Sequence, residues 1–488
     1  MSKDLQGLFK TGTKMAVISL AQSILALTGL VLLTQWISPD QFGEYAIGLT
    51  FLGLFQVISQ FGIVQFSIHK PSLTNSDLNN LSRRLILSTV VFVGFFLGLL
   101  LLNLVGTILN QFPLYAETIA IWVFILILGN VASFNEALML RKYKFFSVSK
   151  NNFIAFLFGN FLTPILLSKY YGLGYHSLII GYFVFELLRV VLMENSIKLK
   201  LVFSEKSNEL GGLRRFTVGF TVAKLGNYLA LNSDNIILGS IMGTSALGVY
   251  SRAYQLVLAP VNLIYGVLDK IYFSVLSREQ DDLMGIKLVY LQSVSVIFLV
   301  ISPAVIGLSI FSEEIILLVF NTAWSELYIV FGVMILTVPF RLAYRLNDSV
   351  LRALGKVNRR AFIQWVYAGF VITAAYYSAF IDLQAVAIAI SAVVILNYIM
   401  LTVLICSVLS ISLLELLYWS FIPCIFLLSV LITVIFVLCC LFLGFGNKNS
   451  FLSLPIFAIS SLIIGFSYRH AKIILRTLLC RVKEIGVY

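Results

Sequence analysis

The composition of this 488-residue chain is that of a membrane protein. Hydrophobic residues make up 60% of it and charged residues only 11%, whereas soluble chains have about 45–50% and about 25%. A soluble globular protein is therefore excluded. The net charge of +12 does not indicate nucleic acid, because the basic residues are spread through short gaps between apolar runs and act as topology signals.

Apolar runs long enough to cross a bilayer follow one another along the whole chain. The first extends from Met15 to Trp36 and is too long for the core of a signal peptide. The later runs are centred near residues 54, 94, 128, 159, 184, 225, 257, 297, 334, 370, 395, 430 and 459. Because a spanning helix needs about 20 residues, the sequence predicts an all-α polytopic protein with about 14 transmembrane helices, numbered here as spans in chain order.

The gaps after the even-numbered spans are the longer ones and hold most of the 34 Lys and Arg residues. The densest is a predicted loop from Arg341 to Arg360, and the N-terminal and C-terminal segments are also basic. The positive-inside rule therefore predicts that both termini and this loop are cytoplasmic. The tail after Ser467 has the spacing of an amphipathic helix on the inner leaflet, or serves only to fix the topology.

Matching strings follow the first and the seventh span at an offset of 205 residues. Phe42-Gly43-x-Tyr45-x-x-Gly48 aligns with Leu247-Gly248-x-Tyr250-x-x-Ala253. Six spans separate the two copies, so both halves keep the same orientation. The repeat predicts two halves related by a pseudo-two-fold axis along the membrane normal, which is a transporter-like plan.

A buried lysine on span seven is the first candidate for a site. Lys224 lies roughly 15 Å into the membrane from the Arg214–Arg215 pair, near the midplane, where a charge costs about 2.5–3.5 kcal/mol. Polar residues share its helix face: Thr217, Asn227, Tyr228 and Asn235. This stripe predicts a cavity lining; the alternative is that Lys224 pairs with a structural carboxylate of another helix.

Span eight carries a second cation. Arg252 follows the Gly248-x-Tyr250 turn, has Gln255 on its side, and is followed by Pro260, which breaks the backbone hydrogen-bond ladder. Arg252 either extends to the outer headgroups or lies at the outer end of the cavity. At the repeat offset it aligns with Ile47, so the second half has a charge where the first has none.

Three further charged residues lie within spans. Glu186 and Arg189 are three residues apart on span six and are expected to form a self-neutralising pair. The alternative is that Glu186 couples transport to protons, with Arg189 and Asp234 as further candidates for coupling. Asp234, near the outer end of span seven, is expected to cap or line the turn rather than bind a cation.

The residues around the seventh and eighth spans resemble a known family. Asn232-Ser233-Asp234-Asn235-Ile236-Ile237-Leu238-Gly239, followed by Ala246-Leu247-Gly248-Val249-Tyr250-Ser251-Arg252-Ala253-Tyr254, is similar to oligosaccharide (Wzx-type) flippases of the polysaccharide transporter branch of the MOP exporter superfamily. Ser38-Pro39-x-x-Phe42-Gly43-x-Tyr45 and Leu140-Arg141-Lys142-x-x-Phe145 add to the likeness. Span count and length agree with the family over essentially the whole chain.

The resemblance implies an architecture and a substrate. Two six-helix bundles, residues 1–200 and 201–410, would surround a cavity that opens to each side in turn, with two additional helices over 411–467 and a basic tail over 468–488. The implied activity is transfer of undecaprenyl-diphosphate-linked oligosaccharides to the outer leaflet of the bacterial inner membrane for O-antigen, capsule or exopolysaccharide assembly. A polysaccharide polymerase and a chain-length regulator are possible partners. Lys224 and Arg252 would then bind the diphosphate, and Asn227, Tyr228, Asn235 and Gln255 the glycan.

Three alternatives stay open at this point. A multidrug exporter of the same superfamily would be expected to have acidic cavity residues, and a lipid II flippase would also bind a diphosphate. An enzyme, such as a membrane glycosyltransferase or polymerase, is disfavoured because the outer loops are short. No G-x-x-x-x-G-K-[ST] loop is present, which excludes an ATP-driven pump within this chain. Neither a cofactor nor a metal is predicted.

Overall fold

The computed structural model describes residues 3–70, 73–104, 116–194, 213–278 and 282–412, together with Leu414, Glu415 and Trp419. Over these residues the chain is helical and contains no strand, which confirms the predicted all-α class. The predicted spans near residues 430 and 459 and the basic tail 468–488 lie outside the described residues, so the number of 14 spans stays a prediction.

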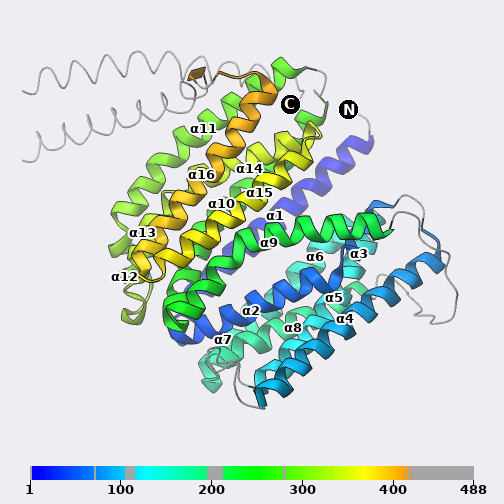
Figure 1. Ribbon diagram of the computed structural model, residues 1–488, viewed down its shortest axis with the longest axis vertical. Coiled ribbons are helices and arrows are strands. Elements are labelled where there is room, and N and C mark those ends of the chain that lie inside the picture. Colours follow the sequence, from blue (N-terminus) through cyan, green and yellow to red (C-terminus); the bar gives the residue numbers. More distant parts are fainter. Residues whose placement is uncertain are drawn as a thin grey trace, which may run out of the picture. The chain divides into compact units, whose positions relative to one another are not determined.

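Helices cover every predicted span up to residue 409 (Figure 1). In chain order they are α1 (Lys3–Leu33), α2 (Pro39–Gln60), α3 (Ile63–His69), α4 (Asn75–Leu104), α5 (Ala116–Arg141), α6 (Phe145–Phe156), η1 (Leu157–Leu162), α7 (Thr163–Tyr171), α8 (Tyr175–Glu194), α9 (Leu213–Ile241), α10 (Thr244–Arg278), α11 (Leu283–Ile310), α12 (Ser312–Val319), η2 (Thr322–Trp324), α13 (Leu327–Ile335), α14 (Val338–Ala353), α15 (Val357–Ser378) and α16 (Leu383–Leu409).

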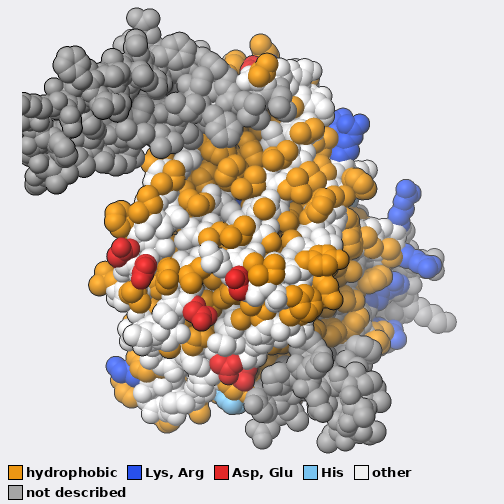
Figure 2. Space-filling view, turned by 60° about the vertical axis from the view of Figure 1, so that its left-hand side comes forward, with side chains coloured by type: hydrophobic (Ala, Val, Ile, Leu, Met, Phe, Trp, Pro, Cys, Tyr) orange, Lys and Arg blue, Asp and Glu red, His pale blue; other side chains and the backbone are white. Residues whose placement is uncertain are grey.

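The described helices have the apolar exteriors of a multi-pass membrane protein. Seven are long and apolar enough to cross a membrane, and the pair α13 and α14, bent by 48°, makes an eighth if it counts as one span. Large apolar side chains such as Phe124 and Val91 are more than half exposed, and hydrophobic side chains cover much of the face in Figure 2. In a bilayer these side chains contact lipid, so their exposure carries no hydrophobic cost.

Packing divides the chain into two compact units. Unit 1 comprises Met1–Gly266, Glu313–Phe331 and Gln364–Val393, whereas unit 2 comprises Val267–Ser312, Gly332–Ile363 and Val394–Tyr488. This division follows packing, whereas the predicted bundles 1–200 and 201–410 follow the sequence repeat. The bundle boundaries therefore remain a prediction.

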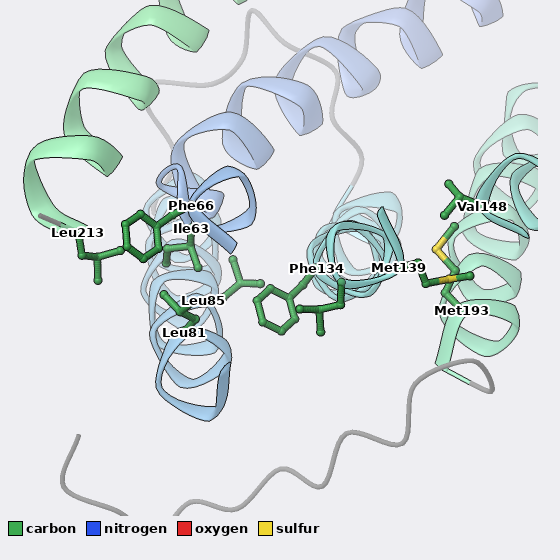
Figure 3. Close-up of a cluster of buried hydrophobic side chains, with 10 residues drawn as sticks. Ile63, Phe66, Leu81, Leu85, Phe134, Met139, Val148, Met193 and Leu213 are labelled. Atoms are coloured by element: carbon green, nitrogen blue, oxygen red, sulfur yellow. The ribbon is translucent and has the colours of Figure 1, made fainter. Parts of the chain in front are cut away.

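The core of unit 1 lies where α5 packs on α8 and α2 packs on α9. A cluster of buried apolar side chains connects α3, α4, α5, α6, α8 and α9 (Figure 3). Its members are Ile63, Phe66, Leu81, Leu85, Phe134, Leu138, Met139, Val148, Met193 and Leu213. The cluster fixes the beginning of α9, the helix that holds Lys224, against the first part of the chain.

Local sequence signals set both ends of α2. At its start Ser38 and Gln41 form a capping box, each side chain accepting a hydrogen bond from the other's backbone N–H. At its end Phe61 and Gly62 both adopt left-handed conformations, with φ of 42° and 64°. A Cβ atom on Gly62 would lie 2.9 Å from the carbonyl oxygen of Thr217 on α9. Glycine therefore allows α2 to end directly against α9.

The two copies of the repeat pack against each other through their glycines. A Cβ on Gly43 of α2 would collide with the backbone carbonyl of Thr244, and one on Gly248 of α10 would collide with that of Pro39. Pro39 aligns with Thr244, and Gly43 with Gly248, at the offset found in the sequence. The Thr244 hydroxyl also donates to the Asp40 carboxylate. The contact is thus reciprocal, as a pseudo-two-fold relation requires.

In unit 2, α11 packs against α14 and three aromatic rings fill the space between α11, α14 and α16. The Phe340 ring lies 5.3 Å from that of Phe298 and 5.6 Å from that of Tyr398, both edge-on. The Asn347 amide donates to the Thr402 hydroxyl at 2.9 Å. The buried side of α14 is therefore held by both apolar and polar contacts.

The prediction that residues 341–360 form a loop is wrong. Helix α14 continues to Ala353 and α15 begins at Val357, so most of this segment is helical. Arg341 is 1% exposed, and its Nε donates to the Thr337 hydroxyl at 2.9 Å. The density of arginines hid a helical pattern of buried apolar residues, namely Leu342, Leu346 and Val350.

Candidate functional site

Lys224 faces α2 from the middle of α9. Its ammonium nitrogen donates to Gln60 Oε1 at 3.0 Å, and Gln60 itself is 5% exposed. Among the described residues no carboxylate lies within 4.0 Å of this ammonium. Within the described residues, Lys224 therefore forms no salt bridge to another helix. Its partner is the side-chain amide of Gln60.

Tyr228 lies one turn further along the same face of α9. Its hydroxyl donates to the backbone carbonyl of Thr50 at the middle of α2. Gly53 makes the approach possible, since a Cβ there would lie 2.7 Å from the hydroxyl oxygen. The stripe thus contacts α2 rather than open space at this level.

The two asparagines predicted on the polar face of α9 make fewer hydrogen bonds than Lys224 and Tyr228 do. Asn227 and Asn235 are partly buried, and the structure gives neither side-chain amide a hydrogen bond to another described residue. The backbone N–H of Asn235 donates to Asp234 Oδ1 at 2.9 Å. Both amide side chains keep their hydrogen-bonding capacity for a ligand.

Asp234 connects α9 to α10. It is 3% exposed, and its Oδ2 accepts a hydrogen bond from the Tyr250 hydroxyl at 2.6 Å. Tyr250 belongs to the repeated motif and is fully buried. This contact ties α9 to α10, while the predicted role of Asp234 at the turn between spans seven and eight stays a prediction.

Arg252 is buried on an aromatic platform. It is 6% exposed, and its guanidinium carbon lies 3.8 Å from the centroid of the Phe42 ring, a cation–π contact. Its Nη1 donates to Gln255 Oε1 at 2.7 Å. Its Nε is buried and has no hydrogen-bond partner within the part of the chain that the structure describes. The side chain therefore does not extend to the lipid headgroups.

The platform beneath Arg252 is itself fixed. Trp324 packs edge-on to Phe42 with ring centroids 5.3 Å apart, and its indole N–H donates to the backbone carbonyl of Thr34 at 3.2 Å. Trp324 is fully buried. The guanidinium is thus held over an aromatic pair, and its buried Nε has no acceptor among the described residues.

The two cations do not come together in this structure. Lys224 contacts Gln60, the last residue of α2, whereas Arg252 contacts Phe42, near its first residue. These two α2 residues are 18 positions apart, which corresponds to about 27 Å along the helix axis. Side chains on helices lean towards the N-terminus of their own helix, so the two charged groups also point away from each other.

Arg189 and Glu186 form the predicted pair on α8, and a third residue joins them. Arg189 Nη1 donates to both oxygens of Glu186 at 3.0 and 2.8 Å, and its Nη2 donates to Glu136 of α5 at 2.6 Å. Its Nε donates to Asn152 Oδ1 at 3.1 Å. Two carboxylates therefore share one guanidinium. The coupling role of Glu186 stays a prediction.

The partners of the site residues could not be predicted from the sequence. Gln60, Phe42, Trp324 and Glu136 all come from helices distant in the chain, and none stands at a helical spacing from the residue it contacts. Only the repeat pointed to Phe42, because Phe42 belongs to the first copy of the motif and Arg252 lies within the second copy. The others had no signal in a single sequence.

The chain matches the family model of polysaccharide biosynthesis proteins over residues 32–329. The match spans more than half of the chain, and the chain belongs to this family. The lipopolysaccharide biosynthesis protein WzxC of Escherichia coli (strain K12) is 25% identical over 354 residues, which are 71% of this chain and 70% of that protein. The family resemblance predicted from the residues is thereby confirmed.

Two further comparisons add a second relative and a solved structure with a similar fold. The succinoglycan biosynthesis transport protein ExoT of Rhizobium meliloti (strain 1021) is 20% identical over 307 residues, covering 63% of this chain and 61% of that protein. The solved structure of lipid II flippase MurJ in an inward closed conformation superposes with a TM-score of 0.64 and 17% identity, covering 95% of this chain and 99% of that one. The chain thus has the fold of that structure.

Proposed function

We propose that this protein moves undecaprenyl-diphosphate-linked oligosaccharide units from the cytoplasmic to the outer leaflet of the bacterial inner membrane by alternating access. The product serves O-antigen, capsule or exopolysaccharide assembly. The observation that best supports this substrate is Lys224, a partly buried ammonium in the predicted seventh span. Among the described residues its partner is an amide rather than a carboxylate. A phosphate can replace an amide oxygen there and form a stronger, charge-assisted hydrogen bond.

Charge compensation is the physical task of such a transporter. A diphosphate cannot enter hydrocarbon without a counter-charge, and Lys224 and Arg252 each supply one positive charge. With the cell interior negative, outward movement of about two uncompensated negative charges gains roughly 4–5 kcal/mol per 100 mV. Transport by this route needs neither ATP nor a catalytic residue.

The proposed setting includes other proteins of glycan assembly. A polymerase and a chain-length regulator on the outer side would consume the exported unit, and the amphipathic basic tail would lie on the inner leaflet. Both termini would be cytoplasmic, and residues 1–200 and 201–410 would form the two bundles that alternate. The Lys and Arg distribution and the repeat support this arrangement.

The orientation predicts where membrane-impermeant thiol reagents react. In a cysteine-free background, a cysteine at Asn358, in the first turn of α15, or at Lys483 should resist labelling from outside intact cells and react once the cells are permeabilised. A cysteine at exposed Tyr171, at the end of α7, serves as the outside control. Labelling of position 358 or 483 in intact cells would show that the orientation is reversed or wrong.

Reconstitution tests the function itself. Purified protein in liposomes should expose a fluorescent undecaprenyl-diphosphate oligosaccharide to an external quencher faster than protein-free liposomes do, without ATP. Lipid II offered in parallel tests the competing cargo, and a cationic dye tests multidrug export. Growth of the glycan chain in these liposomes would instead indicate a polymerase or glycosyltransferase. Faster movement of lipid II or dye alone would contradict the proposed substrate.

A further inference from the structure

Resting on the proposed function, we propose that the substrate diphosphate binds at two separate stations in succession, first at Lys224 and then at Arg252. The two cations contact α2 residues that lie about 27 Å apart along the helix. A diphosphate is far too short to touch both. One phosphate group therefore cannot be shared between them in this conformation, and the substrate must pass from one to the other.

The Lys224 station is built for capture in the inner half of the membrane. Its ammonium lies against the last residue of α2, where the helix ends at Phe61 and Gly62. The negative end of the helix dipole favours a cation there. An ammonium held by an amide and a dipole is not neutralised, so it can exchange Gln60 for a phosphate oxygen.

The Arg252 station is built for a more rigid contact. Its guanidinium is held over Phe42, which packs edge-on to Trp324, and Nη1 is fixed by Gln255. The buried Nε lacks a partner among the described residues. An unpaired donor in a buried site costs free energy unless a ligand arrives to accept its hydrogen bond. A phosphate oxygen is such an acceptor.

Tyr228 separates the two stations. Its hydroxyl bonds to the carbonyl of Thr50, which stands between Phe42 and Gln60 on α2, and its ring packs on Gly53. Helices α2 and α9 are closed against each other at this level. At the outer end, the crossing at Gly43 and Gly248 is closed as well. In this conformation we therefore expect a substrate from the cytoplasmic side to reach only the inner station.

The test uses a crosslink that holds this closed state. Asp40→Cys with Thr244→Cys, in the full chain with its five native cysteines replaced by serine, should form a disulfide on oxidation, because these two side chains touch. Farnesyl diphosphate binding to the protein in nanodiscs is then measured. In the crosslinked protein, Lys224→Gln should weaken binding about tenfold or more, while Arg252→Gln should leave the affinity unchanged.

Matched measurements keep the outcomes distinct. Arg215→Gln, an exposed change on the same helix as Lys224, should not alter binding, and equal crosslinking yield in every variant shows that the α2–α10 crossing is intact. Equal loss of affinity from Lys224→Gln and Arg252→Gln in the crosslinked protein would overturn the two stations in favour of one site. No affinity in the parent, crosslinked or reduced, would instead overturn diphosphate recognition and with it the proposed function.

Discussion

Lys224→Ala is expected to leave the protein in the membrane at normal abundance and to reduce export of the surface glycan about tenfold or more. The side chain donates to an amide and not to a carboxylate among the described residues, so its loss strands no opposite charge. A hydrogen bond to a charged group contributes about 1.5–3 kcal/mol, and its loss in transport corresponds to a factor of about ten to a hundred. Surface glycan in a complemented null strain is the measurement.

Charge and shape can be separated at this position. Lys224→Arg keeps the positive charge and should retain part of the export, whereas Lys224→Glu places a carboxylate where the phosphate must bind and should retain none. Arg215→Ala, an exposed cation on the same helix, should export normally. Full complementation by Lys224→Ala would show that this ammonium does not bind the substrate.

Arg189→Gln is expected to lower the amount of folded protein in the membrane. The change would leave Glu186, whose side chain is 2% exposed, and Glu136, 26% exposed, without their shared partner. Breaking a buried ion pair by removing one partner costs about 3–5 kcal/mol. Membrane abundance and the thermal unfolding midpoint of the solubilised protein measure the effect.

The presence of Glu136 decides which combination restores stability. Glu186→Gln with Arg189→Gln still leaves the Glu136 carboxylate unpaired, so this double change should recover only part of the loss. Adding Glu136→Gln removes the last charge and should recover more. If Glu186→Gln alone, and the double change, are as abundant as the parent but export nothing, the structural interpretation fails and Glu186 becomes the coupling carboxylate.

Local patterns in the sequence predicted local structure. Apolar runs of about 20 residues located the helices up to residue 409, because a bilayer leaves the backbone few alternatives to the helix. The spacing of Glu186 and Arg189 predicted their pairing, because residues three apart share a helix face. Both inferences needed only neighbours along the chain.

Contacts between distant helices were beyond such patterns. Nothing near Lys224 in the chain indicates Gln60, and nothing near Arg189 indicates Glu136, because tertiary packing chooses these partners. The structure of the segment from Arg341 onward was predicted wrongly for another reason. Its charges dominated the average hydropathy, although its apolar residues follow a helical period that places Arg341 inside unit 2.

The crossing of α2 and α10 has the geometry of a homodimer interface inside a single chain. Gly43 meets Thr244 while Gly248 meets Pro39, so each half offers the same patch to the other. In a true homodimer both subunits have the same sequence, so a residue that is useful on one side of the interface is also present on the other side. The fused chain escapes this constraint, since Arg252 occupies one copy and Ile47 the other. A buried cation can therefore be held over Phe42 in one copy while the matching position of the other copy stays apolar.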